Sequence, residues 1–258
     1  MKLSITILGS GTSAGVPMIG CQCAVCTSPD PRDKRTRPSI ALHYNSHTVL
    51  VDTTPELRLQ AIANSLHKIH AVVFTHAHAD HIFGLDDVRR YNTVLNAPLP
   101  LYATPDTMAV LRRAFAYAFE SVPRTTDALY RPELIPTLID GPFDLFGETW
   151  TPIPLPHGKA AVLGFRVGNF AYCTDCSDIP AASRSLLQDL DVLIIDGLRM
   201  RPHPTHLSFD QAQQIIADLK PKRAFFTHMS HDIRHADLVQ KLPAHVRPLH
   251  DTLVIEST

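Results

Sequence analysis

The stretch HAHADH, residues His76–His81, decides how this chain folds and where its chemistry lies. It follows an apolar, β-branched run, Ala71–Thr75 (AVVFT), which predicts a buried strand. Imidazole and carboxylate groups are ligands of divalent cations, and four of them within six residues is the density that a pair of such ions requires. The alternative, a polar loop that is merely rich in His, is weaker because closely packed imidazoles repel one another on protonation. We therefore expect metal ligands directly after a strand.

Composition and charge narrow the class of protein. The chain has 258 residues, of which 45% are hydrophobic and 19% charged, so a sizeable core is expected. The formal net charge is −1, without the dense basic surface of proteins held to nucleic acid by phosphate neutralisation. We expect a small-molecule substrate, neither nucleic acid nor membrane as a partner, and leave a homodimer open. No segment has the apolar length of a signal peptide or a membrane span, which favours a cytoplasmic protein.

Three of the five cysteines crowd into Cys21, Cys23 and Cys26. They are too close in sequence to pair sensibly with one another, and three thiolates can take three corners of a zinc tetrahedron that needs one distal ligand. Free thiols or a redox role are the alternatives. The preceding Gly9–Gly15 loop only superficially matches a dinucleotide fingerprint, since its third Gly is one place late and Pro17 follows. A tight turn near the active site is the better interpretation.

Several predicted strands end on candidate ligands. Leu3–Leu8 is the first strand, and Ser39–Tyr44 with Thr48–Asp52 predict a hairpin that ends on Asp52. In the second half, residues 151–156, 170–174, 192–195 and 223–227 lead to His157, Asp175, Asp196 and His228. Side chains at strand ends converge on rigid backbone, so we expect these groups to meet.

Helices are predicted between these strands. Thr54 and Pro55 are cap signals for a helix with a core-facing stripe of Leu57, Ala61, Ile62 and Leu66. Residues 82–90 predict a helix that His81 begins. Thr104-Pro105 opens an amphipathic helix that carries Met108, Leu111, Phe115 and Phe119.

Further along, Ser208 and Gln211 form a capping box before another helix, and Thr252–Ile255 is the last predicted strand. Residues 123–142 predict a loop with short extended pieces that could cover the substrate pocket. No linker or charge block divides the chain. We expect a single domain, 1–258, with a Cys-rich zinc-binding loop at about 20–27, and with sheets in two blocks and helices outside.

The donors in chain order resemble the metal-binding signature of the metallo-β-lactamase superfamily of hydrolases. The resemblance implies an α/β fold, the αββα sandwich, with two mixed β-sheets flanked by helices. It implies one metal held by His76, His78 and His157, a second by Asp80, His81 and His228, and Asp175 bridging the two. Asp52 resembles the aspartate that orients a ligand His through its other ring nitrogen.

A narrower resemblance lies at the N-terminus. Residues 9–17 (GSGTSAGVP) with G-C-x-C-x-x-C at 20–26 are similar to the signature of the PhnP-type phosphodiesterases, the phosphoribosyl cyclic phosphate hydrolases. In that family the fourth ligand of a structural zinc is a His three residues after the last active-site His, which here is His231. His206, in the segment THLS, matches a His that lies over the metals and would protonate a leaving oxygen or hold a phosphate. Asp196 could orient His206 or simply support the ligands from outside.

The resulting hypothesis is a metal-dependent phosphodiesterase that hydrolyses a small, cyclic phosphodiester such as phosphoribosyl 1,2-cyclic phosphate. A hydroxide held between two divalent ions, Mn²⁺ or Zn²⁺ or else Fe²⁺, would attack phosphorus, with Asp80 and His206 as catalytic residues. The rivals are a tRNA 3′-processing endonuclease, a thioester or lactam hydrolase, and a metal-binding scaffold without catalysis. Arg199, Arg201 and His203 could meet phosphate or form a solvated loop. Cys173 and Cys176 have thioredoxin-like spacing, but buried thiols are expected there.

Overall fold

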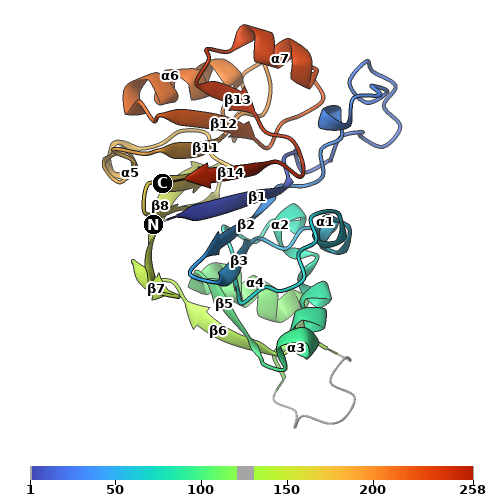
Figure 1. The fold of residues 1–258 in the computed structure, drawn as a ribbon, viewed down its shortest axis with the longest axis vertical. Helices are drawn as coiled ribbons and strands as arrows, with labels where there is room; N and C mark the ends of the chain where they lie inside the picture. The colour runs from blue at the N-terminus through green and yellow to red at the C-terminus, as the bar shows by residue number, and fades with distance from the viewer. Residues whose placement is uncertain (1, 121–130, 258) are drawn as a thin grey trace.

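The structure is a computed structural model that describes residues 2–120 and 131–257. Within these ranges two seven-stranded sheets form the middle of the molecule (Figure 1). The first has the order β14-β1-β2-β3-β4-β5-β6. Its strands are β14 (Val254–Ser257), β1 (Leu3–Gly9), β2 (Ser39–Tyr44), β3 (His47–Val51), β4 (Ala71–Val73), β5 (Leu99–Ala103) and β6 (Leu134–Leu138).

The second sheet has the order β13-β12-β11-β10-β9-β8-β7. Its strands are β13 (Val246–Pro248), β12 (Arg223–Thr227), β11 (Val192–Asp196), β10 (Phe170–Cys173), β9 (Ala160–Val167), β8 (Glu148–His157) and β7 (Phe143–Leu145). In each sheet one half is parallel and the other antiparallel: β3 to β6 and β10 to β13 are parallel runs. The prediction of two mixed sheets is therefore confirmed.

Helices cover the outer faces of this sandwich. In Figure 1, α1 to α4 lie beside the first sheet, and α6 and α7 lie beside β12 and β13 of the second. The bounds are α1 (Leu57–Ala63), α2 (Ala79–Ile82), α3 (Arg89–Leu95), α4 (Pro105–Ala114), α5 (Ala181–Ser185), α6 (Phe209–Leu219) and α7 (His235–Lys241). Short 3₁₀ turns are η1 (Pro31–Asp33), η2 (Leu85–Val88) and η3 (Ala116–Ala118). Among the described residues, none of the helices has the length and apolar character needed to cross a membrane.

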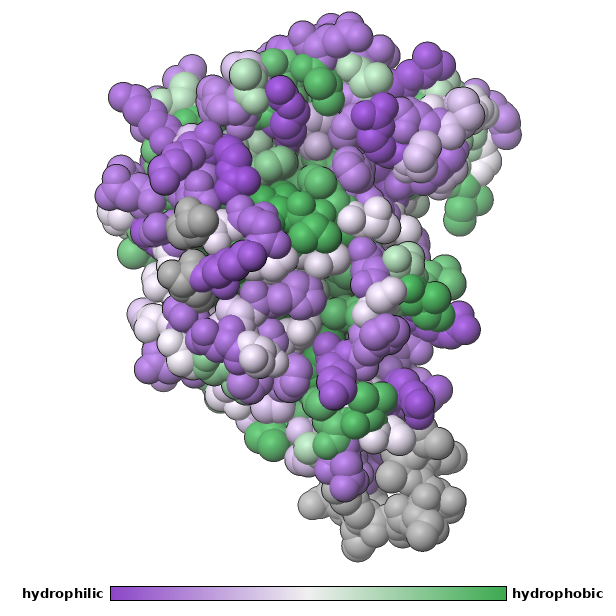
Figure 2. Space-filling view, in the orientation of Figure 1, coloured by the Kyte–Doolittle hydropathy of each residue, from purple (hydrophilic) through white to green (hydrophobic). Residues whose placement is uncertain are grey.

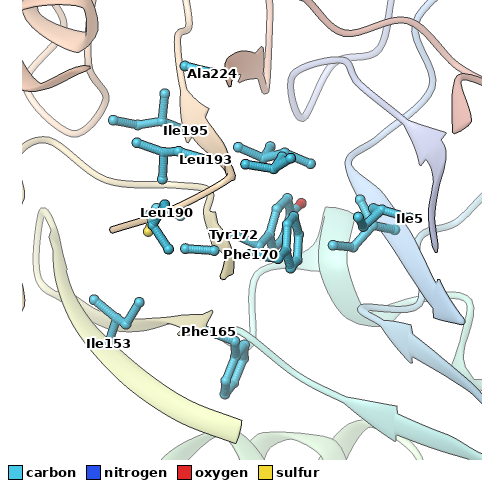
Figure 3. Close-up of a cluster of buried hydrophobic side chains, with 14 of the residues drawn as sticks. Ile5, Ile153, Phe165, Phe170, Tyr172, Leu190, Leu193, Ile195 and Ala224 are labelled. Carbon is cyan, nitrogen blue, oxygen red and sulfur yellow. The ribbon is translucent and has the colours of Figure 1, made fainter. Parts of the chain in front are cut away.

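The period-two pattern of the first sheet explains the layering. Because successive side chains of a strand point to opposite faces, each strand can serve two cores. Ile40 and Leu42 of β2 join the core between the sheets, whereas Ala41 between them joins the core under α1 and α4. Figure 3 shows Ile5 of β1 opposite Phe170 and Tyr172 of β10 in the inter-sheet core.

Three details of the helices differ from the predictions. The first helix begins at Leu57 rather than at Pro55. Thr54 Oγ1 accepts a hydrogen bond from the Glu56 amide, which precedes the helix, and does not cap the helix. Ile62 is 63% exposed, so the predicted core stripe is wrong at that position, while the polar Gln60 is buried and bonds Thr54. The helix predicted to start at His81 is broken into α2, η2 and α3.

Gly84 explains that break. It lies against the Thr54 backbone so closely that a Cβ there would meet the carbonyl oxygen at 2.0 Å. The close approach of backbone to backbone requires Gly, and Gly in turn weakens a continuous helix.

Other predictions agree with the structure. Thr104 caps α4 and Ser208 with Gln211 forms the capping box of α6. The last strand begins at Val254 rather than at Thr252, which has a positive φ of 71°. In the predicted loop 123–142, residues 123–130 lie outside the described part of the chain, and 134–138 form β6 as an edge strand.

On the face drawn in Figure 2 hydrophilic residues predominate and apolar ones occur in small groups.

A buried polar chain ties the two sheets together and yields a stability prediction. The Trp150 indole donates to Tyr44 Oη at 2.9 Å, and Tyr44 donates to the Leu145 carbonyl at 3.0 Å. Tyr44→Phe leaves both partners buried and unpaired, so the free energy of unfolding should fall by about 1–3 kcal/mol. Tyr117→Phe, at an exposed hydroxyl, should change it by less than about 0.5 kcal/mol. Urea unfolding measures both, and equal losses would contradict the role assigned to Tyr44.

His235 at the start of α7 predicts a pH dependence. Burial, reinforced by Arg32, lowers the pKa of His235 to about 4. Since this lies below the ordinary value, protonation favours the unfolded chain. The stabilisation is present above about pH 6.5 and is lost as the pH falls toward 4, to the extent of about 3 kcal/mol. His235→Gln should flatten that part of the stability curve, whereas His67→Gln, at an exposed position, should not. Curves of identical shape for wild type and His235→Gln would contradict the prediction.

Candidate metal centre

Three of the predicted site residues have left-handed backbone. Asp52 follows β3 with φ 64°, Asp175 lies just beyond β10 with φ 52°, and His228 follows β12 with φ 59°. A positive φ is uncommon for residues with a Cβ, and such strain persists only where the surroundings hold it. All three strands take part in parallel pairings, so their carboxyl ends lie at the same side of the sheets. The side chains of Asp52, Asp175 and His228 therefore lie on that side.

The first donor group contains His76, His78, His157 and Asp175, whose ligand atoms lie within 4.8 Å of one another. Nε2 of His76 is 3.7 Å and Nε2 of His157 is 3.8 Å from Oδ2 of Asp175. The rings of His76 and His78 meet edge to face at 4.4 Å. His78 is exposed and the other three side chains are buried, which leaves one side of this group open.

The second donor group contains Asp80, His81, Asp175 and His228. Nε2 of His81 and Nε2 of His228 each lie 3.4 Å from Oδ1 of Asp175. Oδ2 of Asp80 is 3.4 Å from Nε2 of His81 and 3.6 Å from Nε2 of His228. Asp175 therefore offers one oxygen to each group.

These side chains fit a pair of divalent cations. Four of their atoms are buried and have no hydrogen-bond partner among the described residues: Nε2 of His76, His81 and His228, and Oδ2 of Asp80. Burying such atoms unpaired is costly. Donor atoms about 2.0–2.2 Å from one tetrahedral ion lie about 3.4 Å apart, which is close to the spacings observed here. The structure thus brings together all seven predicted ligands, although their assignment to two metals remains a prediction.

Neighbouring groups orient the imidazoles through their other nitrogens. Nδ1 of His81 donates to Oδ2 of Asp52 at 2.7 Å, and Asp52 also accepts the amide and hydroxyl of Thr75. Nδ1 of His157 donates to the Thr205 carbonyl at 2.8 Å. Asp52 therefore lies where the sequence predicted it. Thr75 and the Thr205 carbonyl were missed, because no side-chain pattern marks them beyond their position next to His76 and His206.

The charges in the centre suit cation binding. Burial would raise the pKa of Asp175, but His228 and His81 outweigh it and hold that pKa well below its usual range. Burial lowers the pKa of His76 well below its usual value, so that imidazole is neutral. For His228 burial is outweighed by Asp175 and Asp80, which raise its pKa to about 9. A cation bound at His228 must displace that proton, so acid should oppose metal loading.

The cysteine cluster meets its predicted partner from the far end of the chain. Sγ of Cys21 and Sγ of Cys23 are each 3.3 Å from Nδ1 of His231, and Sγ of Cys26 is 3.5 Å from it. The Cys26 amide, which donates to Sγ, lowers the pKa of Cys23 to about 6, whereas burial raises the pKa of Cys26 to about 11. Three sulfurs around one imidazole nitrogen match the donor set of a structural zinc site. Zinc here remains a prediction.

His206 and Asp196 lie beside the two donor groups. Nδ1 of His206 donates to Oδ2 of Asp196 at 2.7 Å. The His206 ring stacks on His228 at 4.5 Å and meets His157 edge to face at 4.6 Å. Both residues are buried, with the His206 side chain 10% exposed. Of the two roles left open for Asp196, the hydrogen bond favours orienting His206.

The structure also places the remaining candidate residues. Cys173 and Cys176 are fully buried. The Arg199 guanidinium donates to the Arg201 and Pro202 carbonyls of its own loop. His203 accepts the Thr205 amide and its ring lies 5.2 Å from that of His206.

Comparison with known proteins defines the class. Residues 47–229 match the family model of the β-lactamase superfamily domain, so the chain belongs to that superfamily. The fold, the family and the donor groups together support a metal-dependent hydrolase. A solved structure described as a new diphosphatase from the PhnP family is 44% identical with a TM-score of 0.92, over 99% of this chain and 97% of that one. Within the superfamily the chain is thus a member of the PhnP family.

Two curated relatives differ in name. An octanoyltransferase of Porphyromonas gingivalis is 35% identical over 96% of this chain, which spans only 50% of that protein's length. Coenzyme PQQ synthesis protein B of Methylorubrum populi is 30% identical, over 76% of this chain and 73% of that protein. Relatives with such different names match this sequence, so substrate must be argued from the site itself.

Metal content should separate the two kinds of site. Loaded with Mn²⁺ and Zn²⁺, the protein should hold two ions at the donor groups and one zinc at the thiolates. Asp175→Ala should lose the pair and keep the zinc, because it removes the shared carboxylate. Cys23→Ala should lose the zinc and keep the pair. Cys173→Ala, at a buried thiol outside both sites, is the matched control, and elemental analysis reads all three. Loss of the paired ions in Cys23→Ala would contradict two separate sites.

Proposed function

We propose that the protein is a metal-dependent phosphodiesterase acting on a small phosphodiester, with a cyclic one such as phosphoribosyl 1,2-cyclic phosphate as the first candidate substrate. The observation that carries the proposal is His206, held by buried Asp196 against both donor groups. A hydrolase of phosphate esters needs an acid at the position where the leaving oxygen develops charge. Neither a Ser nor a Cys nucleophile is required.

The metal ligands in this proposal are the two donor groups. His76, His78 and His157 would hold one cation, Asp80, His81 and His228 the other, with Asp175 shared. Divalent cations there would supply Lewis acidity, lowering the pKa of a water molecule and neutralising charge on phosphoryl oxygens. Manganese, zinc and iron all suit this nitrogen and oxygen donor set.

His206 supplies the proton in this scheme. Because its Nδ1–H is bound to Asp196, the proton to be transferred is on Nε2 of the imidazolium. The anionic Asp196 stabilises that cation and keeps the ring oriented while Nε2 donates to the leaving oxygen. Burial raises the pKa of Asp196, and the hydrogen bond from His206 opposes this rise.

A second candidate reaction is cleavage of a diphosphate bond. The solved PhnP-family relative that is 44% identical is described as a diphosphatase, which favours this reaction for the present site as well. Both reactions place a nucleophile on phosphorus and expel an oxygen. They differ in the leaving group, since an alkoxide is far more basic than a phosphate and depends more on an acid.

That difference gives a test of His206. His206→Ala should lower kcat on a 2′,3′-cyclic nucleotide by about 10²–10⁴-fold. On bis(p-nitrophenyl) phosphate, whose leaving group needs little protonation, the loss should be much smaller. The metal content of His206→Ala should stay unchanged. The matched control is His203→Ala, which removes the neighbouring ring but leaves the hydrogen bond between His206 and Asp196 intact. Equal losses of kcat on the two substrates would contradict an acid role and leave phosphate binding as the function of His206.

A substrate panel tests the proposal as a whole. The Mn²⁺-loaded protein should be assayed side by side on cyclic and linear phosphodiesters, a dinucleoside diphosphate, precursor tRNA, a thioester and a lactam. Phosphodiester cleavage should be fastest by kcat/KM. Faster cleavage of the diphosphate would select the second candidate. No cleavage of any phosphorus substrate by protein with its metals in place would overturn both.

A further inference from the structure

Arg35 lies four residues before β2 and carries a buried positive charge. Its side chain is 0% exposed and that of its ion-pair partner Asp33 is 1% exposed. Nη2 of Arg35 lies 3.3 Å from Oδ1 of Asp33. The free energy needed to remove two charges from water exceeds the attraction between them in an isolated pair. Further contacts must therefore stabilise this pair.

Those contacts are all on one segment. Nη1 of Arg35 donates to the Ser230 carbonyl at 2.5 Å, and Nη2 donates to the Ile233 carbonyl at 3.1 Å. Oδ1 of Asp33 accepts the His235 amide at 2.7 Å. The buried pair therefore binds three backbone groups between Ser230 and His235, at the end of the connection from β12 to α7.

The whole connection from β12 to α7, residues 228–234, carries a donor of each candidate metal site. His231 lies between the two carbonyls that Arg35 binds, and its Nδ1 faces the three cysteine sulfurs. His228 lies two residues before Ser230 and has the left-handed φ of 59°. A backbone in that conformation is held by its surroundings rather than by its own preference. Both imidazoles therefore lie on a connection that Arg35 binds at two carbonyls, those of Ser230 and Ile233.

The backbone of Arg35 is itself bound to Val16, four residues before the Cys-rich loop at 20–27. Its amide donates to the Val16 carbonyl at 2.7 Å and its carbonyl accepts the Val16 amide at 2.8 Å. Gly11 packs so closely here that a Cβ would lie 2.5 Å from the Arg35 carbonyl oxygen. Arg35 therefore joins Val16, ahead of the Cys-rich loop, to the connection that carries His228 and His231.

We propose that Arg35 is a positioning residue for both metal sites, setting residues 230–233 so that His231 meets the thiolates and His228 meets the second donor group. The proposal rests on the metal assignments above but not on the reaction. Arginine suits this role because its planar guanidinium has five N–H donors in a fixed geometry. A lysine keeps the charge beside Asp33 but cannot bind two carbonyls and a carboxylate in the same arrangement.

The test is Arg35→Lys in the full chain loaded with Zn²⁺ and Mn²⁺. At 25 °C, zinc release to a chromogenic chelator and Mn²⁺ release followed by electron paramagnetic resonance should each become at least tenfold faster. Hydrogen exchange of the amides at 229–235 should rise as well. Arg223→Lys is the matched control: Arg223 also joins a carboxylate, Asp191, to a carbonyl, that of Glu256, but at the opposite end of β12. Its release rates should equal those of the wild type.

The possible outcomes separate positioning from simple stabilisation. If Arg35→Lys lowers the unfolding temperature but leaves both release rates of the folded protein unchanged, the proposal is overturned. If Arg35→Lys does not fold, Asp33→Asn serves instead, because it keeps the guanidinium and removes the charge that orients it. Faster release of both metals from Asp33→Asn then supports the proposal, and unchanged release overturns it. Because the readout is metal release, a negative result in the substrate panel has no bearing on it.

Discussion

The carboxylate of Asp175 is the interaction on which the rest of the centre depends. It is buried, and each of its oxygens faces two imidazoles at 3.4–3.8 Å. Its anionic form is maintained by those rings, chiefly His228 and His81. A single left-handed residue after β10 thus joins donors from α2, from β8, from the end of β12 and from the end of β4.

The two-sheet topology makes that meeting possible. The parallel strands β3 and β4 in one sheet and β10 to β12 in the other end near the same edge, and the donors follow those ends. The inter-sheet core, with the Trp150–Tyr44 bond across it, holds the two edges in register. Distant parts of the chain therefore contribute to one site because rigid strands bring them there, while the residues between them form helices on the outside.

Much of the fold could be predicted from the chain because its signals are local. Strands with buried period-two patterns, the capping box at Ser208 and the cap at Thr104 all depend on residues a few positions apart. The errors have tertiary causes. Ile62 is exposed because the polar Gln60 is drawn inward by Thr54, and the helix after His81 breaks because Gly84 must pack against the Thr54 backbone. The spacing of hydrophobic residues along the sequence reveals neither contact.

The sequence by itself determined the kind of chemistry: the density of donors in His76–His81, the thiolate trio, and the placement of further donors at strand ends follow from residue type and spacing. Only the tertiary structure decided that Asp196 binds His206, that one Asp175 oxygen faces each donor group, and that Arg35 fastens the segment carrying His228 and His231. The physical reason is the separation along the sequence between the groups that interact. Ligand type and strand propensity are encoded within a few residues, whereas hydrogen bonds between groups 10 to 195 positions apart depend on how the sheets and loops pack.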